Sequence, residues 1–397
     1  MTNESEPATH QPLSATLTLI MAVATGIVVA NLYYLQPLLH QMTSDFRVSP
    51  ARASMLIMFV QVGYAVGLAF VVPLGDLFAR RVLIVAIFLL SAVMMATGAM
   101  LTSFSALCAL TVAIGVTSVA GQVIVPFAAD LAEARQRGRV IARVMSGLLF
   151  GILLSRTVSG VLAQAIGWRG VYWSAAGLLT ASAVVLVVTL PDEPARPRLR
   201  YRDLVVGSFS LLVTEVPLRR RAWFGALVFA AFSVLWTTLS FLLAGAPFHY
   251  SNAVIGLFGL FGVAGVAAAN LAGHNADRER TSQSTIGAAF ALTISFAMLW
   301  FGRHSLWILA TGVMLLDAGM NTMQISNQSI IYSLLPDARS RVNSAYMVCC
   351  FAGASLGSFG AGQLYASYAW AGVCWLGAAL GAVLVVLAFA WRSPVVA

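Results

Sequence analysis

Charged side chains are scarce in this chain, and lysine is absent altogether. Asp, Glu and Arg make up 9% of the 397 residues, whereas a soluble domain carries about 25% charged residues because its surface faces water. Hydrophobic residues reach 60%. This composition excludes a water-soluble globular protein of this size and indicates a membrane protein.

Cysteine and histidine are also rare, with four and five residues respectively. All four cysteines lie inside apolar runs, and Cys349 and Cys350 are neighbours. This placement fits small packing residues better than a disulfide or metal framework. The histidines lie outside the apolar runs or at their edges. We therefore expect no bound metal and no cofactor.

The chain lacks the short signatures of catalysis and of nucleotide binding. It has no H-E-x-x-H pattern, no paired aspartates inside an apolar run and no G-x-x-x-x-G-K-[ST] loop. A membrane-embedded enzyme or an ATP-driven pump would need residues of these kinds. We expect neither activity.

Long apolar runs, in contrast, recur along the whole sequence. Each has about 20 residues, the length that a helix needs to cross the hydrocarbon core. Strands of an outer-membrane barrel would be about 10 residues long and would alternate apolar with polar residues. The sequence therefore predicts an all-α membrane protein with twelve transmembrane helices. The predicted spans are 16–39, 53–75, 82–101, 105–130, 140–165, 170–190, 222–245, 252–272, 284–301, 305–333, 342–366 and 370–391.

The arginines favour one side of the predicted bundle. They cluster after every second span, whereas the other loops hold only Arg47, Arg52, Arg169 and Arg303. Because basic residues in short loops favour the cytoplasmic side, both termini are predicted to be cytoplasmic. The first 15 residues contain no basic residue, so we expect no cleaved signal peptide. The arginines adjoin apolar helices, and no nucleic-acid partner is expected.

The two halves of the chain repeat at an offset of 202 residues. The pattern W-x-G-V-x-W begins at Trp168 and again at Trp370, and Arg137 and Arg339 keep the same offset. Each half holds six spans, an even number, so the halves are parallel and related by a pseudo-two-fold axis normal to the membrane. The predicted domains are an N-terminal tail (1–15), a first half (16–190), a linker (191–221), a second half (222–391) and a C-terminal tail (392–397).

The loop after the second span carries a recognisable motif. The run V-P-L-G-D-L-F-A-R-R extends from Val72 to Arg81, and a shorter copy, G-H-N-A-D-R, extends from Gly273 to Arg278. Both resemble the G-x-x-x-D-R-x-G-R-R signature of the major facilitator superfamily, although Leu77 stands where the family has a basic residue. The resemblance implies alternating access and a charge latch between the halves. The implied gating residues are Asp76, Arg80, Arg81, Asp277 and Arg278.

The fifth predicted span adds a narrower likeness. Gly147, Gly151 and Gly160 stand in the register of the glycine-rich pattern of efflux members, with Arg156 where proline is expected. The chain is therefore most similar to bacterial drug and sugar efflux transporters that exchange their substrate for protons. The resemblance implies a multi-pass protein of the inner (cytoplasmic) membrane that works as a monomer.

Two charged residues lie deep inside predicted spans: Arg156 on the fifth and Asp317 on the tenth. A charge near the bilayer centre is costly, so both are candidates for function. They lie at similar depths, within reach of a long arginine side chain. We predict that the two residues couple proton binding to transport. In the alternative, Arg156 and Asp317 only neutralise each other's charge and hold the two halves together.

Polar residues follow one face of the tenth span, with Asp317, Asn321, Gln324 and Gln328 at i, i+4, i+7 and i+11. This stripe either lines a cavity or hydrogen-bonds to neighbouring helices. The resemblance implies that the first, fourth, seventh and tenth helices line a central cavity. Besides this stripe and Arg156, the predicted substrate-binding residues are Asn31, Tyr34, Gln36, Gln122 and Trp236, with Ser118, Thr237 and Ser240 beside them.

Aromatic residues near span ends have a different expected role. Tyr33, Trp168, Trp173 and Trp370 are predicted to be interfacial anchors. The mixture of aromatic and polar groups in the predicted cavity suits a small amphipathic organic molecule, and the two deep charges leave the sign of its charge open. We expect export of such a molecule in exchange for protons. Substrate–proton symport for uptake, a channel, and a membrane-embedded protein without transport activity are the alternatives.

Overall fold

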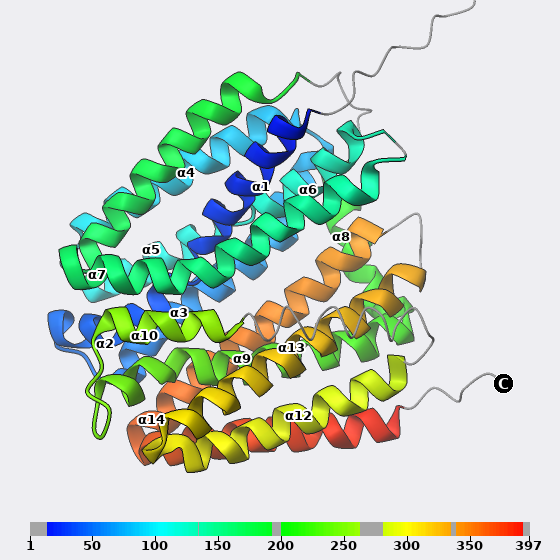
Figure 1. The fold of residues 1–397 in the computed structure, drawn as a ribbon. Helices are drawn as coiled ribbons and strands as arrows, with labels where there is room; N and C mark the ends of the chain where they lie inside the picture. The colour runs from blue at the N-terminus through cyan, green and yellow to red at the C-terminus, as the bar shows by residue number, and fades with distance from the viewer. Residues whose placement is uncertain (1–13, 134, 193–199, 263–280, 335–338, 392–397) are drawn as a thin grey trace, which may run out of the picture.

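The computed structural model describes residues 14–133, 135–192, 200–262, 281–334 and 339–391. Within these ranges every regular element is a helix. The helices run side by side in two groups, one from each half of the chain (Figure 1). The all-α fold predicted from the sequence is confirmed.

The helices of the first half begin at serine caps or at breaks in the apolar runs. The Ser14 hydroxyl accepts a hydrogen bond from the Leu17 N–H, and Ser49 caps the next span through the Arg52 N–H in the same way. Such caps satisfy N–H groups that the first turn leaves unpaired. The elements are α1 (Ala15–Ala30), α2 (Leu35–Phe46), α3 (Pro50–Val66), the π-helical η1 (Gly67–Val71), the 3₁₀-helical η2 (Val72–Asp76), α4 (Arg80–Met100), α5 (Phe104–Thr117), α6 (Ala120–Leu131) and α7 (Arg137–Thr189).

The second half repeats this arrangement after one additional helix. The elements are α8 (Tyr201–Thr214), α9 (Val216–Ala244), α10 (Asn252–Leu257), the 3₁₀-helical η3 (Phe258–Gly262), α12 (Thr281–Phe301), the 3₁₀-helical η4 (Gly302–His304), α13 (Leu306–Leu334) and α14 (Arg339–Ala390).

Two of these helices are far longer than a membrane is thick. α7 has 53 residues and α14 has 52, whereas about 20 residues cross the hydrocarbon core. A positive φ of 71° at Gly167 breaks α7, and the chain turns back (Figure 1). Ala369 breaks α14 with a φ of 49° and lies at the repeat offset from Gly167. Each of these helices therefore supplies two of the predicted spans.

The described helices account for eleven of the twelve predicted spans. Nine helical runs among them are long and apolar enough to cross a membrane, and two of the nine are α7 and α14. α10 and η3 begin the remaining span, predicted at 252–272. Its residues from 263 onward lie outside the described residues.

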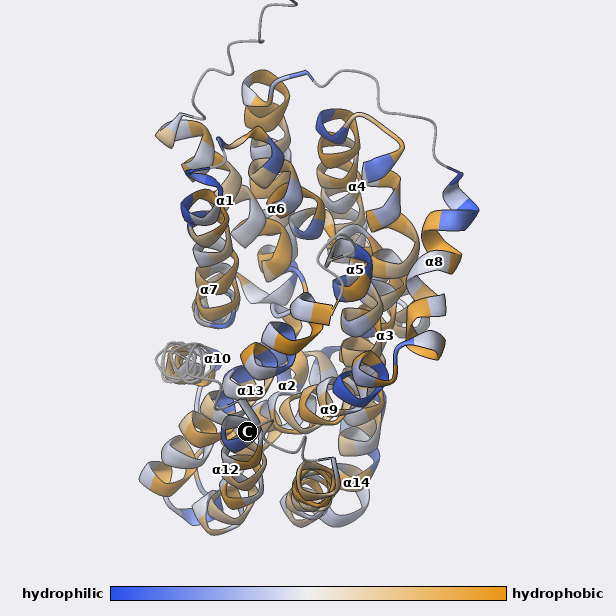
Figure 2. Cartoon of the chain, turned by 90° about the vertical axis from the view of Figure 1, so that its right-hand side faces the viewer, coloured by the Kyte–Doolittle hydropathy of each residue, from blue (hydrophilic) through white to orange (hydrophobic). Residues whose placement is uncertain are grey.

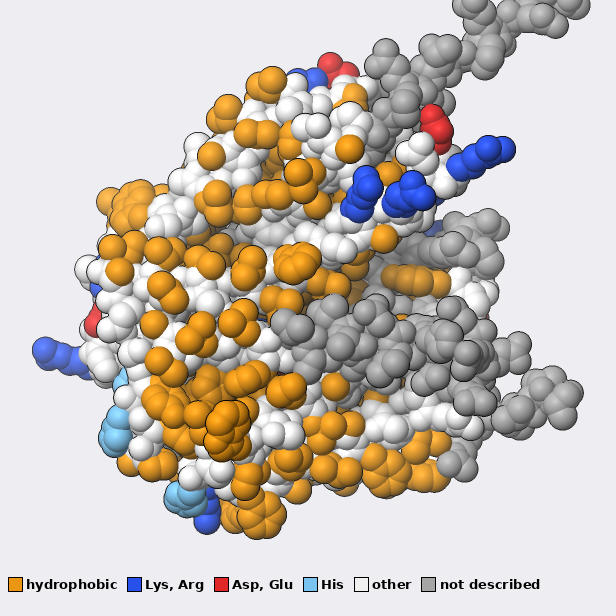
Figure 3. All heavy atoms as spheres, in the orientation of Figure 1, with side chains coloured by type: hydrophobic (Ala, Val, Ile, Leu, Met, Phe, Trp, Pro, Cys, Tyr) orange, Lys and Arg blue, Asp and Glu red, His pale blue; other side chains and the backbone are white. Residues whose placement is uncertain are grey.

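The sides of the bundle are apolar. Leu19, Val188 and Phe301 are 64%, 77% and 68% exposed. On the face drawn in Figure 3, hydrophobic side chains cover the middle, whereas arginines gather at the two ends. Figure 2 shows the same apolar character along most helices. A surface of this kind fits the hydrocarbon core of a bilayer.

The first span and the predicted linker contain helices that the sequence did not specify. The first span is two helices, because α1 ends at Ala30 and α2 starts at Leu35 and continues to Phe46. Pro37 lies in the first turn of α2, where a missing N–H costs least. The segment 191–221, predicted as a linker, contains α8 and the beginning of α9.

The internal repeat also appears in the packing. α1 lies against the first part of α7, where a Cβ on Gly151 would overlap the backbone of Gly26. α9 lies against α14 in the same way, with Gly353 against Ala226, and Gly353 is at the repeat offset from Gly151. Each half contains most of one hydrophobic core, and residues of both halves meet in the second core, which includes Tyr64 and Val119 of the first half. α1 begins and α14 ends at the same end of the bundle, at the right in Figure 1, which we call the terminal end; the opposite end is the far end.

Candidate functional site

Arg156 lies on α7, buried where the two halves meet, with 2% of its surface exposed. Its Nε donates to Oε1 of Gln36 on α2 at 2.5 Å. The guanidinium lies over the ring of Trp236 on α9, with its carbon 3.8 Å from the ring centroid. Tyr33 and Phe232 flank it at 5.0 and 5.5 Å. Three aromatic faces thus surround a desolvated cation, and a contact of this kind is worth about 2 kcal/mol.

Asp317, on α13, lies at the edge of the same indole and is also 2% exposed. The Trp236 Nε1–H donates to Oδ1 of Asp317 at 3.2 Å. Among the ion pairs within 4.0 Å in the described part of the chain, none joins Arg156 to Asp317. The two deep charges are therefore linked through one indole ring, which offers its face to the cation and its N–H to the carboxylate.

The rest of the polar stripe on α13 makes local and interhelical contacts. The Asn321 side chain donates to the backbone oxygen of Asp317 at 2.9 Å. Gln324 accepts a hydrogen bond from the Tyr346 hydroxyl of α14 at 2.8 Å, and Gln328 is partly buried. The end of the stripe near Asp317 thus belongs to the charged site, whereas Gln324 joins α13 to α14.

Apart from Gln36, the polar candidates from the first half are spread over three places. Asn31, in the turn between α1 and α2, is 1% exposed, and both atoms of its amide lack a hydrogen-bond partner among the described residues. Gln122 on α6 donates to the Tyr64 hydroxyl at 3.2 Å. Tyr34 borders an apolar groove of ≈ 770 Å³ between α1 and α7. The structure therefore brings Gln36, but not Tyr34, to the charged site.

The two halves are in close contact from the middle of the bundle to the far end. Gln61 of α3 donates to Ser233 of α9 at 2.9 Å and accepts from Ser358 of α14 at 2.8 Å. α7 crosses α10 so closely that a Cβ on Gly160 would overlap the Asn252 carbonyl oxygen and lie 2.9 Å from Gly256 Cα. Hydrogen bonds thus join the halves in the middle of the bundle, and backbone contact joins them toward the far end.

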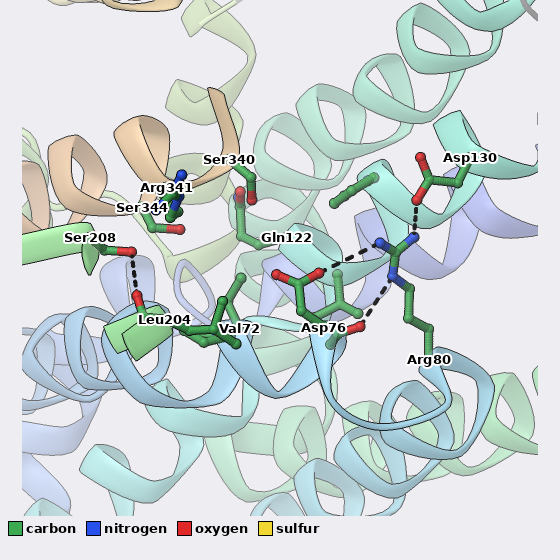
Figure 4. Close-up of a pocket in the computed structure, with 14 residues that line it drawn as sticks. Val72, Asp76, Arg80, Gln122, Asp130, Leu204, Ser208, Ser340, Arg341 and Ser344 are labelled. Carbon is green, nitrogen blue, oxygen red and sulfur yellow. Dashed lines mark hydrogen bonds and ion pairs between the residues drawn. The ribbon is translucent and has the colours of Figure 1, made fainter. Parts of the chain in front are cut away.

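The terminal end is open by comparison. A pocket of ≈ 220 Å³ lies between η2, α4 and α6 of the first half and α8 and α14 that follow (Figure 4). Gln122 is one of its lining residues, and Ser340, Arg341 and Ser344 lie on the other side of the pocket from Arg80. The interface between the halves is therefore hollow at one end and sealed at the other.

The predicted gating residues border this pocket or lie beside it. Arg80, 5% exposed, forms ion pairs with Asp130 at 2.8 Å and with Asp76 at 3.8 Å. Arg81 pairs with Asp192 at 2.5 Å. The two pairs of Arg80 lie within the first half, and the pair of Arg81 joins the first half to the start of the predicted linker. Asp277 and Arg278 lie outside the described residues, so a latch between the halves stays a prediction for the conformation in which the terminal end closes.

The predicted interfacial role is wrong for three of the four aromatic residues. Tyr33 lies against Arg156 inside the bundle. Trp168 and Trp370 are 1% and 5% exposed, and their indole N–H groups donate to Asp45 and to the Leu299 carbonyl. Position near a span end does not distinguish a ring that faces lipid from one that fills the turn between two helices. Trp173, 52% exposed, is on the surface.

Sequence reasoning missed several residues at these sites. Tyr33 and Phe232 complete the aromatic surround of Arg156, and Gln61 joins the two halves. Asp130 pairs with Arg80, and Asn327 is fully buried and donates to the Tyr346 hydroxyl. Gln61 and Asn327 were detectable as amides inside apolar spans. Among the described residues no three His, Cys, Asp or Glu side chains form a metal-binding cluster.

An apolar-sided bundle of two repeated halves, with buried charges between them and access from one end, defines a helical membrane transporter. The family model of the Major Facilitator Superfamily matches residues 21–358. The chain belongs to this superfamily, as its motifs indicated.

Relatives extend the likeness over nearly the whole chain. The uncharacterized transporter YgaY of Escherichia coli O157:H7 is 43% identical over 384 residues, which cover 97% of each protein. The probable transporter SCO4007 of Streptomyces coelicolor is 34% identical over 377 residues, covering 93% of this chain and 86% of that protein. A bacterial homologue of the human lysosomal transporter Spinster, solved in an inward-facing and occupied conformation, shares the fold with a TM-score of 0.77 and 12% identity, covering 96% of both chains.

Proposed function

We propose that this transporter exports a small organic molecule across the inner membrane in exchange for protons. The observation that carries the proposal is the shared indole: Trp236 holds Arg156 by its face and Asp317 by its N–H. Arg156 belongs to the first half and the other two residues to the second. Movement of one half against the other changes these contacts, and protonation of Asp317 changes their energy. Proton binding and conformation are therefore linked.

The contrast between the two ends supports alternating access. The far end is sealed by the contact of Gly160 with α10 and by the packing of Gly362 of α14 against Ser54 of α3. In the orientation that we propose, the terminal end and both termini face the cytoplasm, so this conformation is open inward. Closure of that end would bring the latch residues around Asp76 into contact with the second half.

The substrate site that we propose surrounds the indole. Gln36, Arg156, Trp236 and Asp317 form its centre, and Asn321 adds a further amide. Aromatic faces with a few polar groups suit a small amphipathic molecule. Both halves of the site lie in one chain, so we propose that a monomer is the working unit and that it transports without catalysing a reaction.

Reconstitution into liposomes tests the proposed exchange. Vesicles containing the purified chain are given a panel of small amphipathic compounds, and uptake is measured with the lumen acidic, with the outside acidic and with no pH gradient. Exchange for protons predicts accumulation in vesicles with an acidic lumen, whichever way the protein inserts. Accumulation only when the outside is acidic would indicate symport and contradict export, and uptake insensitive to the gradient would contradict proton coupling.

The proposed orientation has a separate test. Ser105 lies in the first turn of α5, just after the loop that follows α4, and Arg202 lies in the first turn of α8. Both residues are exposed, and they lie at opposite ends of the bundle. In a variant without the four native cysteines, a thiol introduced by Arg202→Cys should react with a membrane-impermeant maleimide only after the cells are broken. One introduced by Ser105→Cys should react in intact spheroplasts. The reverse pattern would overturn the orientation, while the fold would stand.

A further inference from the structure

The guanidinium of Arg156 is incompletely hydrogen-bonded. An arginine offers five N–H donors in a planar fork. Nε donates to Gln36, but Nη2 is buried and has no acceptor among the described residues. A buried donor without a partner costs about 1–3 kcal/mol, and a charged one costs more. The aromatic faces around Arg156 attract its charge but do not act as acceptors in the plane of the fork.

Asp317 does not supply the missing acceptor. Its Oδ1 accepts from the Trp236 Nε1–H at 3.2 Å. Among the ion pairs within 4.0 Å in the described part of the chain, none joins the Asp317 carboxylate to the Arg156 guanidinium. One oxygen of the carboxylate thus has a donor, whereas the buried Nη2 of Arg156 has no acceptor among the described residues. Of the two deep charges, Arg156 is the one with a buried hydrogen-bonding group that a ligand can satisfy.

A second unpaired polar group borders the same place. A small gap beside Arg156 is lined also by Gln36, Pro37, Trp236, Leu239, Ser240 and Ile255. Ser240 is 2% exposed, and its Oγ lacks a hydrogen-bond partner among the described residues. The gap has ≈ 10 Å³ of free volume, room for about one water molecule. Its lining comes from far-end segments of α2, α9 and α10, so the gap widens when those segments separate.

We infer that the substrate is an organic anion whose acidic group binds to Arg156 and Ser240. The inference rests on the proposed transport of a small organic molecule and specifies the charge of that molecule. An acidic group gives Nη2 a charge-assisted hydrogen bond, which is about twice as strong as a neutral one. A cationic substrate would be repelled by Arg156, which lies beside the gap. A single water could fill the gap instead, but it would create no preference for acids.

Thermal stability of the purified full-length chain at neutral pH tests this inference. The probes are benzoate, benzamide and benzylamine, and the aliphatic set hexanoate, hexanamide and hexylamine. We expect an acid to raise the Tm, and its amide and amine not to do so. Ser240→Ala and Arg156→Gln should weaken binding of the acid about tenfold or more, which corresponds to about 1.4 kcal/mol. Arg143→Gln is the matched control, because Arg143 is an exposed arginine on the same helix.

Each other outcome contradicts the inference. Stabilisation by an amide or amine equal to that by its acid would do so, as would no stabilisation by either acid, or acid binding that survives in the Ser240 and Arg156 variants. If Arg156→Gln does not fold, Arg156→Lys keeps the charge without the fork and should still weaken binding. The readout does not depend on transport. Acid-specific binding without transport in vesicles would contradict the proposed function alone, whereas transport of an amine would contradict only the anionic substrate.

Discussion

Replacement of Asp317 by Asn should abolish proton-driven accumulation while leaving substrate exchange intact. Asparagine keeps the shape of the side chain and still accepts a hydrogen bond from Trp236, which contacts Asp317 at 3.2 Å. The asparagine amide cannot bind or release a proton at physiological pH. One pH unit across the membrane is worth about 1.4 kcal/mol, or a tenfold concentration ratio for each proton exchanged. The accumulation ratio of the variant should therefore fall to one.

The control for this experiment is counterflow, in which labelled substrate exchanges with unlabelled substrate without a pH gradient. Wild-type and Asp317→Asn vesicles should exchange at comparable rates. A variant that folds and still accumulates substrate to the wild-type ratio would place proton coupling elsewhere. Because removal of one member of a buried charged pair leaves the other uncompensated, the double variant Asp317→Asn with Arg156→Gln should be more stable than Arg156→Gln alone.

Substitution of Gly160 by Ala should stop the transport cycle by preventing closure of the far end. The added methyl group would overlap the Asn252 carbonyl oxygen and lie 2.9 Å from Gly256 Cα. These are backbone atoms of α10, which cannot move aside as a flexible side chain can. α7 and α10 must therefore separate. Most of each core lies within one half, so the protein should fold while transport falls to the background level.

Gly177 provides a matched control on the same helix. A Cβ there would meet no heavy atom within 4 Å, so Gly177→Ala should transport normally. Ser54 reports on the far end, because it is fully buried where α3 meets Gly362 of α14. In a background without native cysteines, a thiol introduced by Ser54→Cys should react with maleimide faster when Gly160→Ala is also present than when it is absent. Normal transport by Gly160→Ala would show that this contact is not needed for closure.

The charged site shows how far sequence reasoning reached. The deep positions of Arg156 and Asp317 were readable because each is a charge inside an apolar run. The contact between them was not, since they are joined by Trp236, whose face and N–H serve opposite charges. The sequence left the sign of the substrate's charge open. The unpaired Nη2 of Arg156 and the engaged Oδ1 of Asp317 are what favour an anion.

The sequence by itself determined the membrane class, the predicted spans and the two-fold repeat. These follow from linear properties: the length of each apolar run, and an offset that carries Gly167 onto Ala369, where the structure has its two helix breaks. Only the tertiary structure decided that Tyr33 and Trp168 are internal and that the far end is closed. Gln36 and Arg156 are 120 positions apart, and Gln61 and Ser358 are 297 apart. Such pairs depend on which faces two packed helices turn toward each other, and uniformly apolar helices carry too little amphipathic pattern to specify those faces.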